Sequence, residues 1–458
     1  MKQGERNSFA SKIGLILATA GSAVGLGNIW RFPVEAGESG GAAFLLLYIV
    51  FIIAIGVPLM TAEFLVGRAA HANASRAFKT LSPNPVFKRF GIFMILIGWF
   101  IMCYYLVVSG WTLQYLFDSV SGAFIRLEKT GNPNAYADHF NNLISNPWKP
   151  IVCLVIFVLL SHFIIARGVE KGIEKFSKIL MPLLFIILIV LAGCSLFTDG
   201  TKEGLTFLFM PDFSKITFST ALAALGQAFF SLSIATGCLC TYASYFSSPT
   251  DLKTTALKVS FIDSLVAIIA GIVIFPAVFS VGMRPDAGPS LVFVALPNVF
   301  HQAFANLPWI GYIVSAMFYA LLVLATLTSV ISLHEVPTAW LSEGFHMSRR
   351  KASGIVTGVC ILVGSFCSLS MGVLGDWKIG SMNIFDFFDW SSSNVLLPLS
   401  GFFLTLFVGW VMPRSTVYEQ LSNRQGKIVG AVKILVFILR YVAPPAILLI
   451  FMRGLDII

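Results

Sequence analysis

Glu63, Asp263 and Glu335 are carboxylates that stand inside long apolar segments of this sequence. Burial removes their hydration, so each needs a cation, a proton or hydrogen-bond donors beside it, and ionisable residues in such segments are candidates for function. For Glu63 and Glu335 we favour a structural role, in which the carboxylate accepts N–H bonds from interrupted backbone. The residues around Asp263 are apolar, which favours a cation or a proton as its partner. His334 is expected to be packed and hydrogen-bonded, because no second His or Cys stands at metal-ligand spacing.

Two apolar segments are interrupted by small and polar residues. The first carries Gly21, Gly25 and Gly27 within the run GSAVGLG, and Asn28 and Arg31 follow directly. Each Gly costs a helix interior about 1 kcal/mol relative to Ala. Close helix packing through small residues is the alternative, but a lipid-facing helix would not carry the polar and charged residues that follow. We therefore expect a break in this helix, and a break inside a span marks a cavity or a site.

The second interrupted segment reads FFSLSIATGCLCTYASY and clusters Ser231, Ser233, Thr236 and Gly237 near its centre. Ser and Thr can also bond back to the carbonyls of an intact helix, so this feature alone leaves a break and a continuous helix equally open. The two interrupted segments are the first and sixth of the apolar spans. Two interrupted spans at corresponding positions of two five-helix halves are typical of an inverted-repeat transporter with its site at the midplane.

The composition places most of the chain in a membrane. Hydrophobic residues make up 57% of the 458 residues, charged residues 12%, and the mean hydropathy is +0.85, whereas soluble domains are about 25% charged. A soluble multidomain protein is excluded. A secreted disulfide scaffold is excluded too, because all seven Cys lie in apolar runs, where they act as small hydrophobic residues. The net charge of +9 is spread over short loops, which indicates membrane topology and no nucleic-acid surface.

We expect an all-α polytopic protein with one transmembrane domain over residues 1–458. The first repeat covers about 11–197, the second about 216–412, and an extra helix about 428–453. The eleven expected spans are 11–36, 41–68, 88–118, 149–167, 174–197, 216–246, 253–282, 309–342, 351–372, 386–412 and 428–453. The polar start MKQGERNSFASK predicts no cleavable signal peptide.

The loops predict the orientation of the chain. Most of the 31 Lys and Arg residues fall on alternate connections that include the N-terminal segment. Basic residues favour the inner side, so we expect the N-terminus inside and, with an odd number of spans, the C-terminus outside. Two outer connections are long, 119–148 and 283–308. The second is expected to fold back as a lid, because Leu291–Ala295 is too apolar for a free loop.

Five motifs together resemble the neurotransmitter:sodium symporters. GSAVGLGNIWRFP (21–33, followed by ESGGAAF at 38–44), GQAFFSLS (226–233), AGIVIFPAVF (270–279), ATLTSVISLHE (325–335) and FDFFDWSSSNVLLP (385–398) are similar to the first, sixth, seventh, eighth and tenth helices of that family. The resemblance covers nearly the whole chain, and eleven spans are the pattern of many bacterial members. It implies a 5+5 inverted repeat in which the first and sixth helices are discontinuous.

The resemblance also implies an activity. The expected function is import of a neutral, hydrophobic L-amino acid, coupled to sodium, by alternating access across the plasma (inner) membrane of a bacterium. Its partners would be the amino acid, Na⁺ and the lipid bilayer; the oligomeric state is not indicated. A transport-dead amino-acid sensor of the same fold and a sodium symporter for a small non-α amino acid remain alternatives. An intramembrane enzyme is disfavoured, because no nucleophile–base pair or metal triad is present.

The family's two sodium sites carry over to residues of this chain. The first site would use the Ala23 carbonyl, Asn28, Ser231, Asp263 and the substrate carboxylate. The second would use the carbonyls of Gly21, Val24 and Ala325 with the hydroxyls of Thr328 and Ser329. Oxygen ligands of this kind suit a hard cation.

The substrate site carries over in the same way. The substrate carboxylate would meet the amides around Gly25–Gly27 at a half-helix N-terminus, where the helix dipole favours an anion, and the Tyr105 hydroxyl would add a hydrogen bond. The residues expected to contact the substrate are Ser22, Ala23, Gly25, Leu26, Gly27, Ile101, Tyr105, Phe230, Ser231, Ser233, Thr236, Ser329 and Leu333.

By the same resemblance, two pairs and one motif would control access to the site. Arg31 and Asp389 resemble the outer gate pair, with Phe230 as a lid. Arg6 and Glu343 resemble the inner pair, in which the family often has Asp in place of Glu. The spacing Gly172–Pro182 fits a Gly-x9-Pro motif that is associated with local unwinding of the fifth helix.

This sequence departs from the family at residues that bear on specificity and ions. Phe9 replaces a usual Trp. Ala235 stands where bacterial relatives often have Gly and is expected to fill pocket space, while Thr236 replaces a large apolar residue. Asp263 stands where relatives usually have Asn. One helical turn later, Ala267 replaces the Ser with which animal relatives bind chloride. We therefore expect chloride-independent uptake, with Asp263 supplying the negative charge and taking up a proton on the sodium-free return.

Overall fold

The computed structural model describes residues 8–457 apart from 131, 133, 248, 284–290, 305–306 and 423–429. Its described part is almost entirely helical. A two-stranded antiparallel hairpin, β1 (Lys378–Ile379) with β2 (Met382–Asn383), precedes the tenth span, and Lys378 pairs with Asn383 in it. The expected all-α fold is therefore confirmed in the part of the chain that is described.

Nine helical segments of the described chain are long and apolar enough to cross a membrane. The first six, in chain order, are α3 (Ala42–Phe51) continued by η2 (Ile52–Gly56) and α4 (Val57–Ala70); α6 (Pro85–Val120); α9 (Lys149–Ala166); η3 (Val169–Glu174) continued by α10 (Lys175–Ser195); α14 (Leu252–Ser280); and α16 (Pro308–Gly344). The other three are α17 (Arg349–Leu369); α18 (Ile384–Trp390) continued by η6 (Ser391–Leu396), α19 (Leu397–Leu406) and η7 (Phe407–Val411); and α21 (Gly430–Phe437) continued by η8 (Ile438–Val442) and α22 (Ala443–Gly454).

Two further spans are broken. The first consists of α1 (Lys12–Ala23) and the stretch η1 (Gly27–Arg31) plus α2 (Phe32–Glu38), which meet at a bend of 52°. The sixth consists of α12 (Phe218–Ser231) and α13 (Cys238–Ala243), with residues 232–237 between them outside any helix. Both interruptions lie where small and polar residues cluster in the sequence. With these two, the described segments are consistent with the eleven expected spans.

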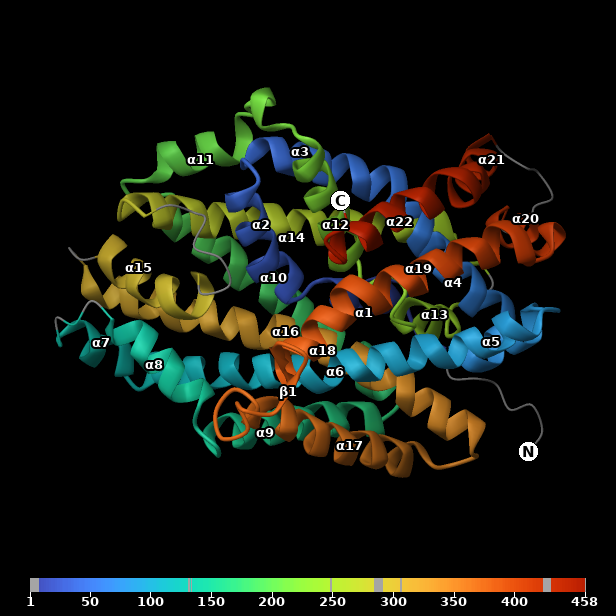
Figure 1. The fold of residues 1–458 in the computed structure, drawn as a ribbon, viewed down its shortest axis with the longest axis horizontal. Coiled ribbons are helices and arrows are strands. Elements are labelled where there is room, and N and C mark those ends of the chain that lie inside the picture. The colour runs from blue at the N-terminus through green and yellow to red at the C-terminus, as the bar shows by residue number, and fades with distance from the viewer. Residues whose placement is uncertain are drawn as a thin grey trace.

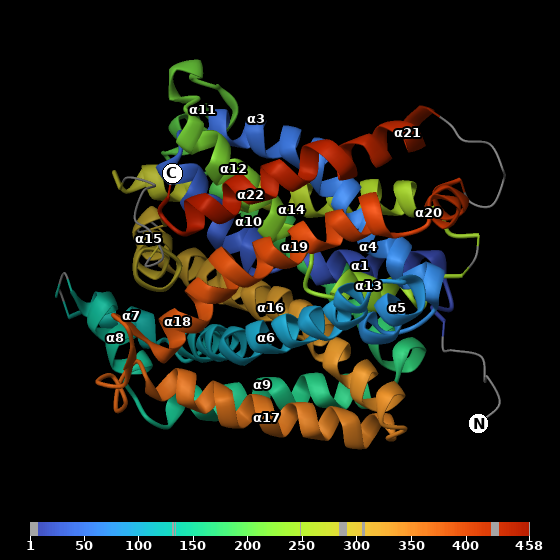
Figure 2. The same cartoon turned by 45° about the vertical axis from the view of Figure 1, so that its right-hand side comes forward.

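The spanning helices run side by side along the long axis of the molecule (Figure 1). In Figure 2 the described start of the chain and its last helix, α22, end at opposite sides of the bundle, as an odd number of spans requires. Short helices cap the two ends. Those of the N-terminal end are α5 (Ala74–Leu81) and α20 (Arg414–Leu421); those of the opposite end are α7 (Ala123–Glu128), α8 (Ala135–Ile144), α11 (Thr201–Phe209) and α15 (Leu296–Ala303).

The apolar piece of the connection 283–308 folds back onto the bundle as expected. Leu291, Val292 and Phe293 form part of the turn η5 (Leu291–Ala295) and are almost fully buried. The hydroxyl of Tyr115 donates to the Phe293 carbonyl at 2.8 Å, and the hydroxyl of Tyr319 donates to the Val292 carbonyl at 2.8 Å. These bonds satisfy carbonyls that a buried loop would otherwise leave without partners.

Glu335 corrects one sequence expectation. Within the described part of the chain it accepts no backbone bond from an interrupted helix; instead the hydroxyl of Tyr245 donates to it at 2.6 Å and Arg349 pairs with it at 2.6 Å. Arg349 begins α17, and the short turn after α16 brings it back beside Glu335. The neighbouring His334 is packed and hydrogen-bonded as expected, with Nδ1 2.8 Å from the hydroxyl of Ser161.

Helix contact at Gly67 gives a test of the packing. A Cβ at this residue of α4 would overlap the backbone carbonyl of Cys240, whereas one at Gly193 of α10 would meet nothing within 4 Å. Gly67→Ala should therefore lower the melting temperature of the purified protein or prevent folding. Gly193→Ala, the matched control, should leave the melting temperature unchanged or raise it, because Ala is more favourable than Gly in a helix by about 1 kcal/mol. Thermal unfolding in detergent measures both, and equal stability of the two variants would contradict this packing.

Candidate functional site

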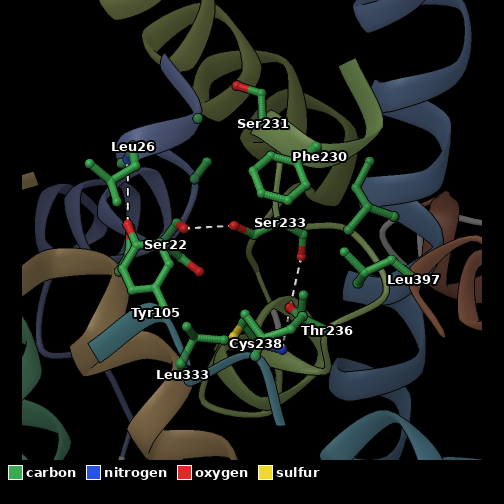
Figure 3. Close-up of a pocket in the computed structure, with 16 residues that line it drawn as sticks. Ser22, Leu26, Tyr105, Phe230, Ser231, Ser233, Thr236, Cys238, Leu333 and Leu397 are labelled. Carbon is green, nitrogen blue, oxygen red and sulfur yellow. Dashed lines mark hydrogen bonds between the residues drawn. The ribbon is translucent and has the colours of Figure 1, made fainter. Parts of the chain in front are cut away.

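A small cavity of about 60 Å³ lies where the breaks of the first and sixth spans meet (Figure 3). Its lining residues are Ser22, Ala23, Gly25, Leu26, Gly27, Ile101, Tyr105, Phe230, Ser231, Ser233, Ile234, Thr236, Cys238, Ser329, Leu333 and Leu397. Every residue that the sequence indicated for substrate contact is among them. The structure thus brings that whole set together around one cavity.

Three lining residues escaped the sequence analysis. Ile234 and Cys238 belong to the non-helical stretch and its exit, where neither helical nor strand periodicity predicts direction. Leu397 comes from the start of α19, and nothing distinguishes it from the other apolar residues of that span. The cluster SLSIATGC could have indicated the first two, because a broken segment exposes adjacent residues to the same space.

One wall of the cavity is polar and is built by very close backbone approach. The amide of Leu26 lies 3.4 Å from the hydroxyl of Tyr105, and the amide of Gly25 donates to Asn28 Oδ1 at 2.9 Å. A Cβ at Gly25 would lie 2.5 Å from the hydroxyl oxygen of Ser329 and 3.1 Å from that of Tyr105. A side chain at this position would displace the Ser329 hydroxyl, and its absence leaves room for hydroxyls and backbone to face the cavity.

The rest of the cavity is mostly apolar. Ile101, Phe230, Leu333 and Leu397 contribute hydrocarbon or aromatic surface. The hydroxyl of Thr236 donates to the Ser233 carbonyl at 2.8 Å (Figure 3), so its hydrogen is already used within the protein. This wall therefore suits an apolar group.

The break in the sixth span is held by side chains of other helices. Ser233 and Ala235 have φ of 51° and 66°, and Gly237 has φ of 81°. Glu63 accepts from the amides of Ala235 at 2.8 Å and of Cys240 at 3.2 Å, and the hydroxyl of Ser400 donates to the Ala235 carbonyl at 2.7 Å. The structural role expected for Glu63 is confirmed, and the sixth span is broken. Ala235 does not line the cavity, so the expectation that its methyl fills pocket space is wrong; its backbone is anchored to α4 and α19 instead.

Asp263 lies at the centre of a fully buried cluster beside the cavity. The Nδ2 of Asn28 donates to its Oδ1 at 2.8 Å, and the hydroxyls of Ser231 and Tyr48 donate to its Oδ2 at 2.8 and 3.2 Å. No Lys or Arg of the described chain forms an ion pair with this carboxylate. Tyr48 was not anticipated, because a single Tyr in the second span carries no local signal. Three neutral donors thus surround a buried acid.

A second cluster of oxygens joins the break of the first span to α16. The hydroxyls of Thr328 and Ser329 lie 3.4 and 3.2 Å from the Val24 carbonyl, and Thr328 also donates to the Ala325 carbonyl at 2.9 Å. A Cβ at Gly21 would lie 3.3 Å from the Thr328 Cβ, so the backbone of Gly21 lies beside the same group. Four of the five predicted oxygen donors of the second sodium site, those of Val24, Ala325, Thr328 and Ser329, come together here, and the backbone of Gly21 lies beside them.

The N-terminal end of the bundle is closed beneath the site. Glu174 accepts from the Ala10 amide at 2.6 Å and the Ser11 hydroxyl at 2.8 Å, and Lys178 pairs with it at 2.6 Å. Phe9 packs against Tyr242, with ring centroids 6.0 Å apart. The fifth span is wound through Gly172–Pro182, with a π-helical turn at Val169–Glu174.

The expected pair at this end is only partly described. Arg6 lies outside the described residues. Glu343 accepts from the backbone amide and the side-chain amide of Asn73 at 3.2 and 2.8 Å. It therefore ties the end of α16 to the start of α5.

The opposite end is more open. A larger cavity of about 350 Å³ lies on the other side of Phe230 and Leu397, and these two residues line both cavities. The guanidinium of Arg31 lies 4.3 Å from the centroid of the Phe230 ring and forms its ion pair with Glu35 at 3.5 Å. The structure does not bring Arg31 within ion-pair distance of Asp389, because its side chain follows α2 instead. Phe230 with Arg31 above it therefore separates the two cavities.

Known proteins match the chain over its whole length. The model of the sodium:neurotransmitter symporter family matches residues 6–139 and 135–457. An uncharacterised sodium-dependent transporter of Bacillus subtilis, YhdH, is 35% identical over 459 residues and is covered completely, as is this chain. The sodium- and chloride-dependent GABA transporter 2 of Rattus norvegicus is 24% identical, over 92% of this chain and 76% of its own. A crystal structure of MhsT in complex with L-phenylalanine superposes with a TM-score of 0.87 at 43% identity, over 98% of this chain and 100% of that one.

The left-handed backbone at Ala235 gives a test of the broken span. An L-residue pays about 1–2 kcal/mol in this region and Gly pays none, so Ala235→Gly should keep or raise the melting temperature. Ala224→Gly, at a fully buried residue in the regular helix α12, should lower the stability by about 1 kcal/mol. Thermal unfolding of the two purified variants in one detergent decides the matter, and an equal loss in both would argue against the left-handed turn.

Proposed function

Because the chain belongs to the sodium:neurotransmitter symporter family, and so is a sodium-dependent transporter and not an enzyme, we propose that it imports a neutral, hydrophobic L-amino acid together with sodium. The observation that carries this proposal is the cavity with two unlike walls. At one wall the Leu26 amide and the Tyr105 hydroxyl converge beside Gly25, and the opposite wall is apolar. An α-amino acid with an apolar side chain has the matching division of polarity.

The polar wall suits the carboxylate of the substrate. Amide and hydroxyl donors stabilise an anion, and the start of the helical stretch at Gly27 adds its dipole in the same sense. The apolar wall suits the side chain, and the solved relative that contains L-phenylalanine supports a substrate of this class. Burial of an apolar side chain is favourable by roughly 25 cal/mol per Å², which would offset the cost of desolvating the charged end.

We propose two sodium sites at the two oxygen clusters. In the first, a sodium ion would neutralise Asp263 with oxygens of Ala23, Asn28 and Ser231 and with the substrate carboxylate. The side chain of Asn28 directs its nitrogen at Asp263, so the amide would turn to offer its oxygen. In the second, the carbonyls of Gly21, Val24 and Ala325 and the hydroxyls of Thr328 and Ser329 would surround the ion. An ion that touches the substrate raises substrate affinity, and by linkage the substrate raises the affinity for that ion equally.

Alternating access would make use of the different ways in which the two ends of the bundle are closed. The end near Phe9 is tied together by aromatic packing and the hydrogen bonds of Glu174, while the larger cavity reaches Phe230 from the other side. With the N-terminus in the cytoplasm, this arrangement keeps the site closed to the inside and separated from the outside by one aromatic side chain. A sensor of the same fold that does not transport is the second candidate; uptake against a gradient into proteoliposomes, driven by sodium, would be seen only with a transporter.

The class of substrate is tested by comparing amino acids with ligands that lack the carboxylate. Gly25 leaves space for a carboxylate, where monoamine-carrying relatives place an Asp to meet an amine. We expect L-Leu and L-Phe to raise the melting temperature of the purified protein in sodium, by mass action on the folded state, and the corresponding decarboxylated amines to give no shift. Equal shifts for an amino acid and its amine would contradict the assignment of the polar wall.

Chloride independence is tested through Asp263. We expect uptake into proteoliposomes to be unchanged when gluconate replaces chloride, because the carboxylate already supplies the negative charge beside the ion. Asp263→Asn should lose most of this uptake or become dependent on added chloride. Asp376→Asn, which removes a charge from an exposed loop, is the matched control and should transport normally. Loss of wild-type uptake in gluconate, or normal chloride-free uptake by Asp263→Asn, would refute the proposal.

A further inference from the structure

Arg440 is a charged residue inside the last apolar span that has no role in the substrate site. It lies in η8, a π-helical turn between α21 and α22. Among the described residues it has no ion-pair partner, and its buried Nε has no hydrogen-bond partner. A guanidinium has five N–H donors, and ionisable groups in a span are costly and usually functional. The protein therefore leaves most of this hydrogen-bonding capacity unused.

Two aromatic side chains frame the guanidinium. Its central carbon lies 4.4 Å from the ring centroid of Trp410 and 5.8 Å from that of Tyr441. The Trp410 Nε1 donates to the Arg440 carbonyl at 3.3 Å, which fixes the indole beside η8. Trp410 and Tyr441 are 53% and 52% exposed. The frame therefore faces the surroundings of the bundle, and aromatic rings attract a cation without accepting its conventional hydrogen bonds.

The position along the span is that of lipid headgroups. Trp410 is the next-to-last residue of the tenth span, which ends at Val411 and is followed by an exposed Arg414. A Cβ at Gly409 would lie 3.0 Å from the Arg440 Cγ, so the tenth and eleventh spans cross closely at this level. The tenth span leads directly into α20, which lies on the N-terminal side of the bundle (Figure 2), so this contact lies toward that side. Trp, Tyr and basic residues are typical of this depth in a membrane.

We propose that Arg440, Trp410 and Tyr441 form a binding site for the phosphate of an anionic phospholipid. The planar guanidinium pairs with two phosphate oxygens at once, which Lys cannot do. The exposed side chains of Arg414 and Lys433 add positive charge on the same side of the membrane, and basic groups near a span attract anionic headgroups. Charge complementarity, the unused donors and the lipid-facing aromatic frame select this occupant. With the N-terminus in the cytoplasm, the lipid belongs to the cytoplasmic leaflet.

Native mass spectrometry of the full-length protein tests the site. The protein is purified in neutral detergent and offered equal amounts of phosphatidylglycerol and phosphatidylcholine with the same acyl chains. Wild type should retain phosphatidylglycerol in preference. Arg440→Gln should retain roughly tenfold less of it, because charge-assisted hydrogen bonds are lost, with phosphatidylcholine unchanged. Arg126→Gln, which removes an equal charge from the exposed side of α7, is the matched control and should behave as wild type.

Two further arms keep the test decisive. Arg440→Lys keeps the charge and loses the planar fork, so it should also retain less phosphatidylglycerol; this variant decides if Arg440→Gln fails to fold. Thermal unfolding with phosphatidylglycerol or with inorganic phosphate separates the lipid from free phosphate, and only the lipid should raise the melting temperature of wild type. Equal retention by wild type and both Arg440 variants, or an equal shift with inorganic phosphate, would overturn the proposal.

Discussion

Backbone inside a bilayer must satisfy its hydrogen bonds within the protein, and the architecture of this transporter depends on how it meets that constraint. Two spans give up helical bonds to build the cavity. Glu63 compensates in the sixth span by accepting two of its amides, and Ser400 donates to one of its carbonyls. The hydroxyl of Ser233 donates to the carbonyl of Ser22 at 2.8 Å, which joins the two breaks directly. The breaks are thus stabilised by each other and by intact neighbouring helices.

The same constraint explains where charge is tolerated. Glu335 is buried and paired with Arg349, and Glu174 is paired with Lys178. Asp263 differs, because its partners among the described residues are neutral donors from three separate helices. A carboxylate left in this state favours a cation, so the site that breaks the helices is also the site where a cation would be most stabilised. Coupling between ion and substrate then needs no long pathway, since both would meet at the same break.

The two ends of the bundle differ in how they are closed. Phe9, Ser11 and Glu174 close the N-terminal end through hydrogen bonds and aromatic packing. At the other end the ring of Phe230 lies beside the Arg31 guanidinium in a cation–π contact, an interaction of about 0.5–2 kcal/mol. The two ends therefore differ in kind: a polar and aromatic network lies at one, and Phe230 and Leu397 separate two cavities at the other.

Composition and local pattern in the sequence determined the membrane class, the spans and the break at Gly21–Gly27, because hydropathy and helix-breaking residues act over a few turns. The motifs that resemble the family supplied the residues expected around the substrate. Tertiary structure decided the rest. It chose between the two readings of the segment around Ser233, paired Glu335 with Arg349 and placed Tyr48 beside Asp263. These outcomes join residues far apart in the chain, and the choice among several chemically suitable partners depends on which helices pack together, which no local pattern encodes.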